Sequence, residues 1–261
     1  MSEEVILKVS HLNKSFEVDG NRISVLKDIN FEIKKGEFIT IVGHSGCGKS
    51  TLLKILAGLM NYDNGEVIRN GKNLDGPSAD CGMVFQEHRL LPWLKVKDNV
   101  SFGIRRLPKK EREKLVKKQL KLVRLENFEN AYPRQLSGGM SQRAAIARGL
   151  VTNPDILLLD EPFGALDAMT RVKMQKEILR IWKEERTTMI MVTHDLDEAL
   201  LLGQRVIVLS SNPGEVRDIL DMSQAGVKGR NSENFGFYKR KIYQYFFEGE
   251  DDEETNVEYM I

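Results

Sequence analysis

A glycine-rich stretch that could bind phosphate lies in the first fifth of the chain. Residues 43–51 read Gly-His-Ser-Gly-Cys-Gly-Lys-Ser-Thr and match the pattern G-x-x-x-x-G-K-[ST] at every fixed position. Glycines let the backbone wrap closely, so that several N–H groups converge on one phosphate. Lys49 would reach the β- and γ-phosphates, and the Ser50 hydroxyl would bind Mg²⁺. We expect the whole stretch to line a nucleotide site: Gly43, His44, Ser45, Gly46, Cys47, Gly48, Lys49, Ser50 and Thr51.

Polar residues also follow three later runs of apolar or β-branched residues, 83–85, 156–159 and 187–193, each of which predicts a buried strand. Ligands of open parallel sheets bind beyond the carboxyl ends of the strands, so these side chains should gather beside the phosphate loop. They are Gln86, Asp160, Glu161 and His194.

Each of these residue types suits one part of phosphoryl transfer to water. Asp160 can hold the Mg²⁺, directly or through water. Glu161 is one residue further on and points elsewhere, which makes it the candidate general base for the attacking water. We expect His194 to contact the γ-phosphate or the water rather than the core. Gln86 carries no charge; it would sense metal and water, or else close a turn.

A second anion site is predicted where Ser137, Gly138 and Gly139 open a helix. A hydroxyl, two glycines and a helix N-terminus together suit a phosphate. One chain with two phosphate sites is explained by a head-to-tail homodimer, in which each serine–glycine helix closes over the nucleotide of the other chain.

The elements that must position these residues alternate between strands and helices. Phe38–Val42 is the strand before the phosphate loop, and Leu52–Leu59 is the helix after it. Val5–Phe16 and Val25–Ile33 read as two paired strands joined by a turn. Alternation of strands and helices predicts an α/β fold with a mostly parallel sheet.

A helical subdomain at about residues 87–153 interrupts this core. Lys110–Arg124 is a basic amphipathic helix, and Gly138–Val151 is another helix with a small-residue face. The basic face could bind nucleic acid or anionic lipid, but charge runs of this kind are usually solvated, which is the interpretation we favour.

Composition limits the remaining possibilities. The 261 residues are 41% hydrophobic, enough for one large or two small domains, and the two cysteines form no disulfide framework. The sequence shows neither a signal peptide nor an apolar run near the roughly 18 residues that span a bilayer. Residues 248–261 hold seven acids and no Lys or Arg, while residues 1–247 carry a net charge of +8. We expect this acidic end to be solvated and disordered.

Residues 4–217 resemble the ATP-binding subunit of an ABC transporter. The resemblance implies that ATP is the nucleotide, that Phe16 stacks on adenine, and that the serine–glycine segment binds the γ-phosphate of the partner subunit. The aromatic is commonly Tyr in the family, and Met140 replaces a commoner Gln. The matching motifs, in chain order, are Phe16, residues 43–51, Gln86, residues 136–140, Asp160-Glu161, residues 165–167 and His194.

The implied fold is a P-loop NTPase core with an antiparallel β-subdomain and an inserted α-helical subdomain. Residues 4–220 would form this ABC ATP-binding domain, and residues 221–261 a C-terminal helix and acidic tail.

A finer resemblance points to the nitrate, sulfonate, taurine and bicarbonate importer group, through residues 90–103 and 209–214. It implies a polytopic membrane permease, a periplasmic or lipid-anchored solute-binding protein, and a place on the cytoplasmic face of the membrane. The apolar run 90–93 would contact the permease; the alternative is that it packs inside the helical subdomain.

A phosphate loop also occurs in two other classes of protein, soluble ABC-type ATPases and P-loop GTPases. A soluble ABC-type ATPase that acts on nucleic acid or ribosomes usually has a coiled-coil insertion or two cassettes, and this chain has neither, so we expect no nucleic-acid partner. A P-loop GTPase would need an Asn-Lys-x-Asp guanine reader, which Asn13-Lys14-Ser15-Phe16 does not supply.

Overall fold

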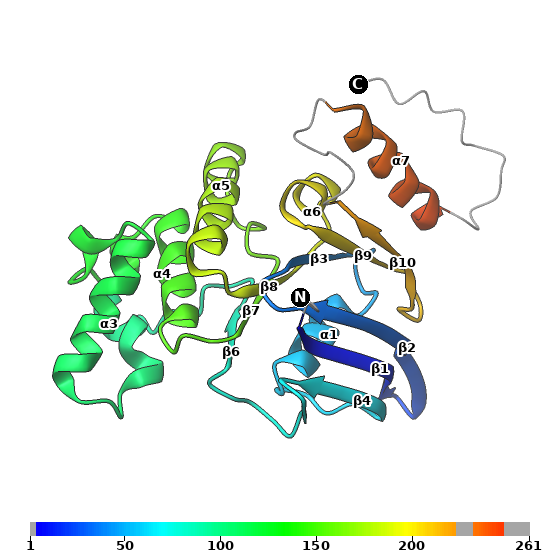
Figure 1. Cartoon of the computed structure of the whole chain (residues 1–261), viewed down its shortest axis with the longest axis horizontal. Coiled ribbons are helices and arrows are strands. Elements are labelled where there is room, and N and C mark those ends of the chain that lie inside the picture. Colours follow the sequence, from blue (N-terminus) through cyan, green and yellow to red (C-terminus); the bar gives the residue numbers. More distant parts are fainter. Residues whose placement is uncertain (1–3, 223–231, 248–261) are drawn as a thin grey trace.

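A six-stranded sheet separates two layers of the molecule, as the computed structural model shows for residues 4–222 and 232–247 (Figure 1). The strand order is β10-β9-β3-β8-β7-β6, and all neighbours run parallel except β10 and β9. The mostly parallel sheet predicted from the sequence is therefore confirmed. The strands are β3 (Phe38–Val42), β6 (Cys81–Val84), β7 (Ile156–Asp160), β8 (Thr188–Thr193), β9 (Arg205–Leu209) and β10 (Val216–Asp221).

Both faces of this sheet are buried, which explains why its strands are continuous apolar runs. On one face, Ile41, Leu158 and Ile190 pack against the helix that follows the phosphate loop and against the second sheet. On the other face, Leu157, Leu159 and other alternate residues pack against the remaining helices.

The second sheet is antiparallel, in the order β2-β1-β4-β5. Its two long strands form a hairpin that continues up to a turn at Asp19 and Gly20, whose φ angles are +51° and +76°. Positive φ at both central residues suits the twist of a tight hairpin, so the strands run further than the sequence indicated. The strands are β1 (Val5–Val18), β2 (Asn21–Lys34), β4 (Asn64–Arg69) and β5 (Lys72–Asn73).

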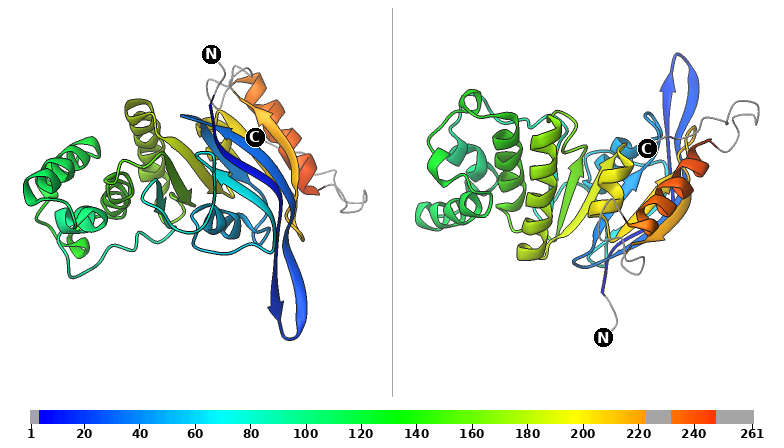
Figure 2. Two further views of the ribbon diagram at one scale, coloured as in Figure 1. Left: turned by 60° about the horizontal axis from the view of Figure 1, so that its bottom comes forward. Right: turned by 90° about the horizontal axis from the view of Figure 1, so that it is seen from above.

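The helices of the predicted helical subdomain lie between β6 and β7 in the sequence (Figure 2). Its periodic apolar residues are buried as predicted, including Val116, Leu120 and Val123. Its elements are α2 (Val96–Val100), η1 (Ser101–Ile104), α3 (Lys109–Leu122), η2 (Glu126–Phe128), η3 (Pro133–Gln135) and α4 (Gly138–Leu150). The other helices are α1 (Lys49–Leu56), α5 (Ala168–Glu185), α6 (Leu196–Leu202) and α7 (Glu233–Phe247).

Two predicted boundaries were wrong. Helix α1 begins at Lys49, inside the glycine motif, and ends before Gly58 rather than at Leu59. Gly58 has φ +73°, and a Cβ there would lie 2.2 Å from the backbone of Gly76, so a close backbone crossing ends the helix. Strand β6 ends at Val84, and Phe85 instead lies against the guanidinium of Arg89.

The C-terminal helix α7 packs on α6, beside β9 and β10, through buried Phe235 and Ile242 (Figure 2). The acidic end from Glu248, which we expected to be solvated and disordered, lies outside the described residues. None of the helices in the described part of the chain is long and apolar enough to cross a bilayer.

Candidate nucleotide site

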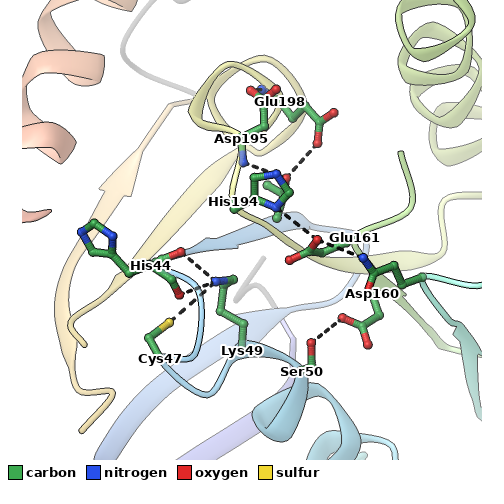
Figure 3. A network of polar contacts seen from close by, with 12 residues as sticks. His44, Cys47, Lys49, Ser50, Asp160, Glu161, His194, Asp195 and Glu198 are labelled. Atoms are coloured by element: carbon green, nitrogen blue, oxygen red, sulfur yellow. Dashed lines mark hydrogen bonds and ion pairs between the residues drawn. The ribbon is translucent and has the colours of Figure 1, made fainter. Parts of the chain in front are cut away.

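The phosphate loop connects β3 to α1 and is packed beneath the hairpin of the second sheet. Gly48, with φ +96°, immediately precedes the helix, and a Cβ there would lie 2.7 Å from Leu26 of β2. Only glycine fits this close approach and this backbone conformation. The buried Lys49 ammonium donates hydrogen bonds to the carbonyl oxygens of Gly43 (2.7 Å) and His44 (2.8 Å), which hold the loop curled around it (Figure 3).

A hydroxyl and a carboxylate meet beside the loop. Ser50 Oγ donates to Asp160 Oδ1 at 2.8 Å (Figure 3). Burial raises the pKa of Asp160, although the hydrogen bond from Ser50 opposes that shift. Within the described residues no three His, Cys, Asp or Glu side chains form a metal cluster. Mg²⁺ usually keeps its waters and takes one or two carboxylates with substrate phosphates, so Ser50 and Asp160 fit that ion.

Glu161 lies where three strand ends converge. Its backbone has φ +42° and its N–H donates to Val192 O of β8, which sets the carboxylate apart from that of Asp160. Its Oε2 lies 3.1 Å from His194 Nδ1 and accepts from Gln86 Nε2 at 3.5 Å. The structure therefore brings Gln86, Glu161 and His194 together, as the strand-end argument predicted. The His194 side chain is 62% exposed, so it is not a core histidine.

Behind His194 lies a buried polar network that the sequence analysis missed. The Thr193 hydroxyl donates to Glu198 Oε2 at 2.8 Å and accepts from the Asp195 N–H at 3.1 Å. Gln175 of α5 donates to the other oxygen of Glu198 at 3.3 Å. Burial raises the pKa of Glu198, which is only 4% exposed. The spacing of Asp195 and Glu198 matches a helix capping box, the one local signal that could have revealed them.

The family assignment follows from comparison with known proteins. A family model described as "ABC transporter" matches residues 26–164, more than half of the chain. The chain belongs to this family. It is therefore an ATP-binding and ATP-hydrolysing transporter subunit, and the predicted fold and ATPase activity are confirmed.

Relatives of this ABC transporter subunit include ATP-binding proteins named for aliphatic sulfonate import and for bicarbonate transport. It is 46% identical over 240 residues to the aliphatic sulfonates import ATP-binding protein SsuB of Bacillus cereus, covering 92% of this chain and 95% of that protein. It is 48% identical over 215 residues to the bicarbonate transport ATP-binding protein CmpC of Synechococcus elongatus, covering 80% and 32% respectively. A solved dimeric, post-hydrolysis state of the ATP-binding cassette MJ0796 bound to ADP and Pi matches with a TM-score of 0.73 and 35% identity, covering 83% of this chain and 99% of that one.

Phe16, the expected adenine-stacking residue of this ABC subunit, lies on β1 opposite Ile23 of β2. It is half-buried, and the Lys14 ammonium lies 5.1 Å from its ring centroid. A little further along β2, Val25 and Leu26 contact Gly48 of the phosphate loop. The hairpin therefore places Phe16 on the strand pair that touches the loop. Adenine stacking itself stays a prediction.

Ser137 is the N-cap residue of α4, and its Oγ accepts from Met140 N at 3.3 Å. Ser137 and Gly138 are exposed, whereas Gly139 is buried so closely against Thr170 that a Cβ would lie 2.8 Å from Thr170 Cγ2. Helix α4 packs on the face of the sheet opposite α1. Within one chain of this ABC subunit, the phosphate loop and the segment 137–139 therefore belong to elements on opposite faces of the central sheet.

Proposed function

We propose that this ATPase powers the import of a small anion, of the sulfonate, nitrate, taurine or bicarbonate class, through a polytopic membrane permease. The observation that carries the proposal is the 46% identity to a sulfonate-import ATPase over nearly the whole of both chains. The same relatives favour transport over action on nucleic acid or ribosomes.

The chemistry assigned to the site is hydrolysis of ATP by an activated water. Ser50 and Asp160 would hold Mg²⁺, which would neutralise charge on the phosphates when bound. Lys49 binds the β- and γ-phosphates, and Glu161 accepts the proton of the attacking water. His194 and Gln86 fix the position of the Glu161 carboxylate, since both contact its Oε2. Both residues therefore influence hydrolysis by positioning the Glu161 carboxylate.

The segment after Gln86 is the proposed permease contact. The buried Asn99 side chain bonds to Leu91 N and O and to the carbonyl oxygens of Leu94 and Lys95, which fixes the shape of the segment. Leu90 packs against the helical core, while Trp93 is 69% exposed. Leu90 therefore fits the interpretation that the run 90–93 packs inside the helical subdomain. Trp93 fits the other interpretation, that the run contacts the permease. An exposed tryptophan on a rigid segment is a suitable anchor for a protein partner.

The remaining parts of the assembly are proposed on the same resemblance. Two copies of the chain would form a homodimer that shares its nucleotide sites, on the cytoplasmic face of the membrane. A periplasmic or lipid-anchored solute-binding protein would select the solute. Residues 4–220 would form the ATP-binding domain, with the helical subdomain at about 87–153, and residues 221–261 an extension.

Reconstitution with the permease tests the function. The chain, its co-purifying polytopic membrane protein and the solute-binding protein are reconstituted in vesicles, and uptake of an alkanesulfonate, taurine, nitrate and bicarbonate is measured with and without ATP. We expect ATP-dependent uptake of one of these anions, and none with Glu161→Gln. ATPase activity that RNA or ribosomes stimulate, with no membrane protein co-purifying, would instead support the nucleic-acid alternative.

A further inference from the structure

The ring of His194 needs an anchor, because its side chain is 62% exposed. It lines a cavity of about 450 Å³ that residues 43–45 of the phosphate loop also line. Its Nδ1 lies 3.1 Å from Glu161 Oε2. That contact can hold the Glu161 carboxylate in one place only if the backbone that carries His194 is itself fixed.

The residues on both sides of His194 are bonded to Glu198 of α6. Thr193, the last residue of β8, donates its hydroxyl to Glu198 Oε2 at 2.8 Å. Asp195, the N-cap residue of α6, accepts the Glu198 N–H at 3.1 Å through its Oδ1. The Thr193 hydroxyl also accepts the Asp195 N–H at 3.1 Å. Three hydrogen bonds therefore close a ring around the turn that carries His194 (Figure 3).

This ring differs from an ordinary helix cap. In a capping box the carboxylate three residues into the helix accepts the N–H of the N-cap residue directly. Here the Thr193 hydroxyl takes the Asp195 N–H, and the Glu198 carboxylate binds that hydroxyl instead. The start of α6 is thereby tied to the end of β8, next to His194.

Helix α5 holds the Glu198 carboxylate from the other side. Gln175 Nε2 donates to Glu198 Oε1 at 3.3 Å, and Arg171 Nε lies 3.8 Å from the same oxygen. Arg171 Nη2 in turn donates to Leu166 O, just before α5, at 3.5 Å. Glu198 is 4% exposed, and a buried carboxylate with partners on both oxygens has little freedom to move. It is therefore a rigid anchor for the turn.

We propose that Glu198 is a positioning residue: through Thr193 it fixes the turn that carries His194, and so the ring that contacts the Glu161 carboxylate. The effect on hydrolysis rests on the roles proposed above for Glu161 and His194. Misplacing a catalytic group by about 1 Å can cost about 10²-fold in rate. Loss of the anchor should therefore lower kcat about 10- to 100-fold and leave the KM for ATP unchanged.

Two buried threonines at opposite ends of β8 give a matched pair of variants. The Thr188 hydroxyl accepts the Gly36 N–H at 2.9 Å, far along the strand from His194. Thr193→Val and Thr188→Val each keep the size of the side chain and remove one buried hydroxyl, so both should lower Tm by a few degrees. We expect only Thr193→Val to lower kcat, and Thr193→Ser, which keeps the hydroxyl, to restore most of the rate. An equal loss of kcat in the two valine variants would trace it to general destabilisation and contradict the proposal.

Glu198→Gln tests the carboxylate itself. The amide has one oxygen, so it cannot accept from both Thr193 and Gln175. We expect kcat to fall about as far as in Thr193→Val, with ATP still bound. Because both changes break the same contact, the double variant Thr193→Val/Glu198→Gln should be little slower than either single variant. Losses that multiply in the double variant would show that Glu198 does not act through Thr193.

NMR of ¹³C-labelled histidine in the full chain separates this inference from the proposed function. The chain has four histidines, and the signal of His194 is the one that His194→Ala removes. We expect this signal to shift or broaden in Thr193→Val and Glu198→Gln but not in Thr188→Val. An unchanged signal in the first two variants would overturn the proposal. A changed signal with kcat at the wild-type value would support the anchoring of His194 and refute instead its proposed part in hydrolysis.

Discussion

Glu161 Oε2 lies 3.1 Å from His194 Nδ1, although the two residues are joined to different strands of the sheet. Glu161 directly follows β7 and His194 directly follows β8, and the parallel register pairs Asp160 with Val192. The two side chains meet because neighbouring parallel strands end at the same level. The carboxylate is thus placed by the sheet rather than by a loop, which suits a base that must meet a water in one position.

Replacing Glu161 by Gln should keep ATP binding and remove turnover. The amide has nearly the size of the carboxylate but cannot accept the proton of the attacking water, and loss of a general base typically lowers a rate by about 10²–10⁴. ATP-bound dimers should accumulate, and gel filtration with ATP and Mg²⁺ measures them. Hydrolysis near the wild-type rate would show that Glu161 is not the base.

Replacing Asp160 by Asn should stabilise the nucleotide-free protein at neutral pH. Burial raises the pKa of Asp160 above 3.8, so its stabilising effect is complete below that pH and is lost as pH rises through the folded-state pKa. At about pH 7.5 the folded chain must therefore bury a charge that Asn lacks. A gain of about 1 kcal/mol corresponds to a rise in Tm of about 2–4 °C. Thermal unfolding in EDTA measures this.

The pH dependence is the control for that prediction. The gain in Tm should be smaller at about pH 4, near the ordinary pKa of the carboxyl, than at pH 7.5, since fewer Asp160 carboxyls are ionised there. ATPase activity should be lost at both pH values, because Asp160 is the proposed Mg²⁺ ligand. An equal gain at both pH values would trace the stabilisation to something other than the charge.

Local patterns predicted much of the fold and of the site. Val116, Leu120 and Val123 recur at helical spacing and are buried on one face, and the polar residues after β6, β7 and β8 converge. These features depend on periodicity and on where strands end, both of which are visible in a short window of sequence.

Other features depend on contacts between distant segments and left no local pattern. Gln175 of α5 donates to Glu198 of α6, and Phe246 lies on His44 although the two are about 200 residues apart in the sequence. Nothing in the sequence near Gln175 or Phe246 specifies which residue it contacts. The early end of α1 likewise depends on Gly76, which passes close to Gly58 only in the folded chain.

Removing the Trp93 side chain should weaken permease binding without affecting the ATPase of the isolated subunit. Trp93 is 69% exposed and lies on a segment fixed by Asn99, so truncation should not disturb the core. Loss of an anchoring tryptophan typically removes about 2 kcal/mol or more, which is roughly a 30-fold weaker complex. Transport and co-purification with the permease should both decline.

Phe128→Ala is the matched control, because Phe128 is an aromatic residue of the same helical region, in η2, and is 42% exposed. Equal losses in both variants would refute a specific contact at Trp93.

Mixing two inactive variants should restore one nucleotide site if the sites are shared between chains. Lys49 and the exposed Ser137 lie in different layers of one chain, on opposite faces of the central sheet. If each site combines Lys49 of one chain with Ser137 of the other, a heterodimer of Lys49→Ala and Ser137→Arg collects both lesions in one site. The other site is intact and should retain ATP.

The measurement is the ATP retained by the purified heterodimer, because turnover could require two working sites. If each chain instead built its own site, both sites would carry one lesion and no ATP would be retained. Circular dichroism of each single variant verifies that it is folded, so that an empty heterodimer would contradict the shared site rather than report misfolding.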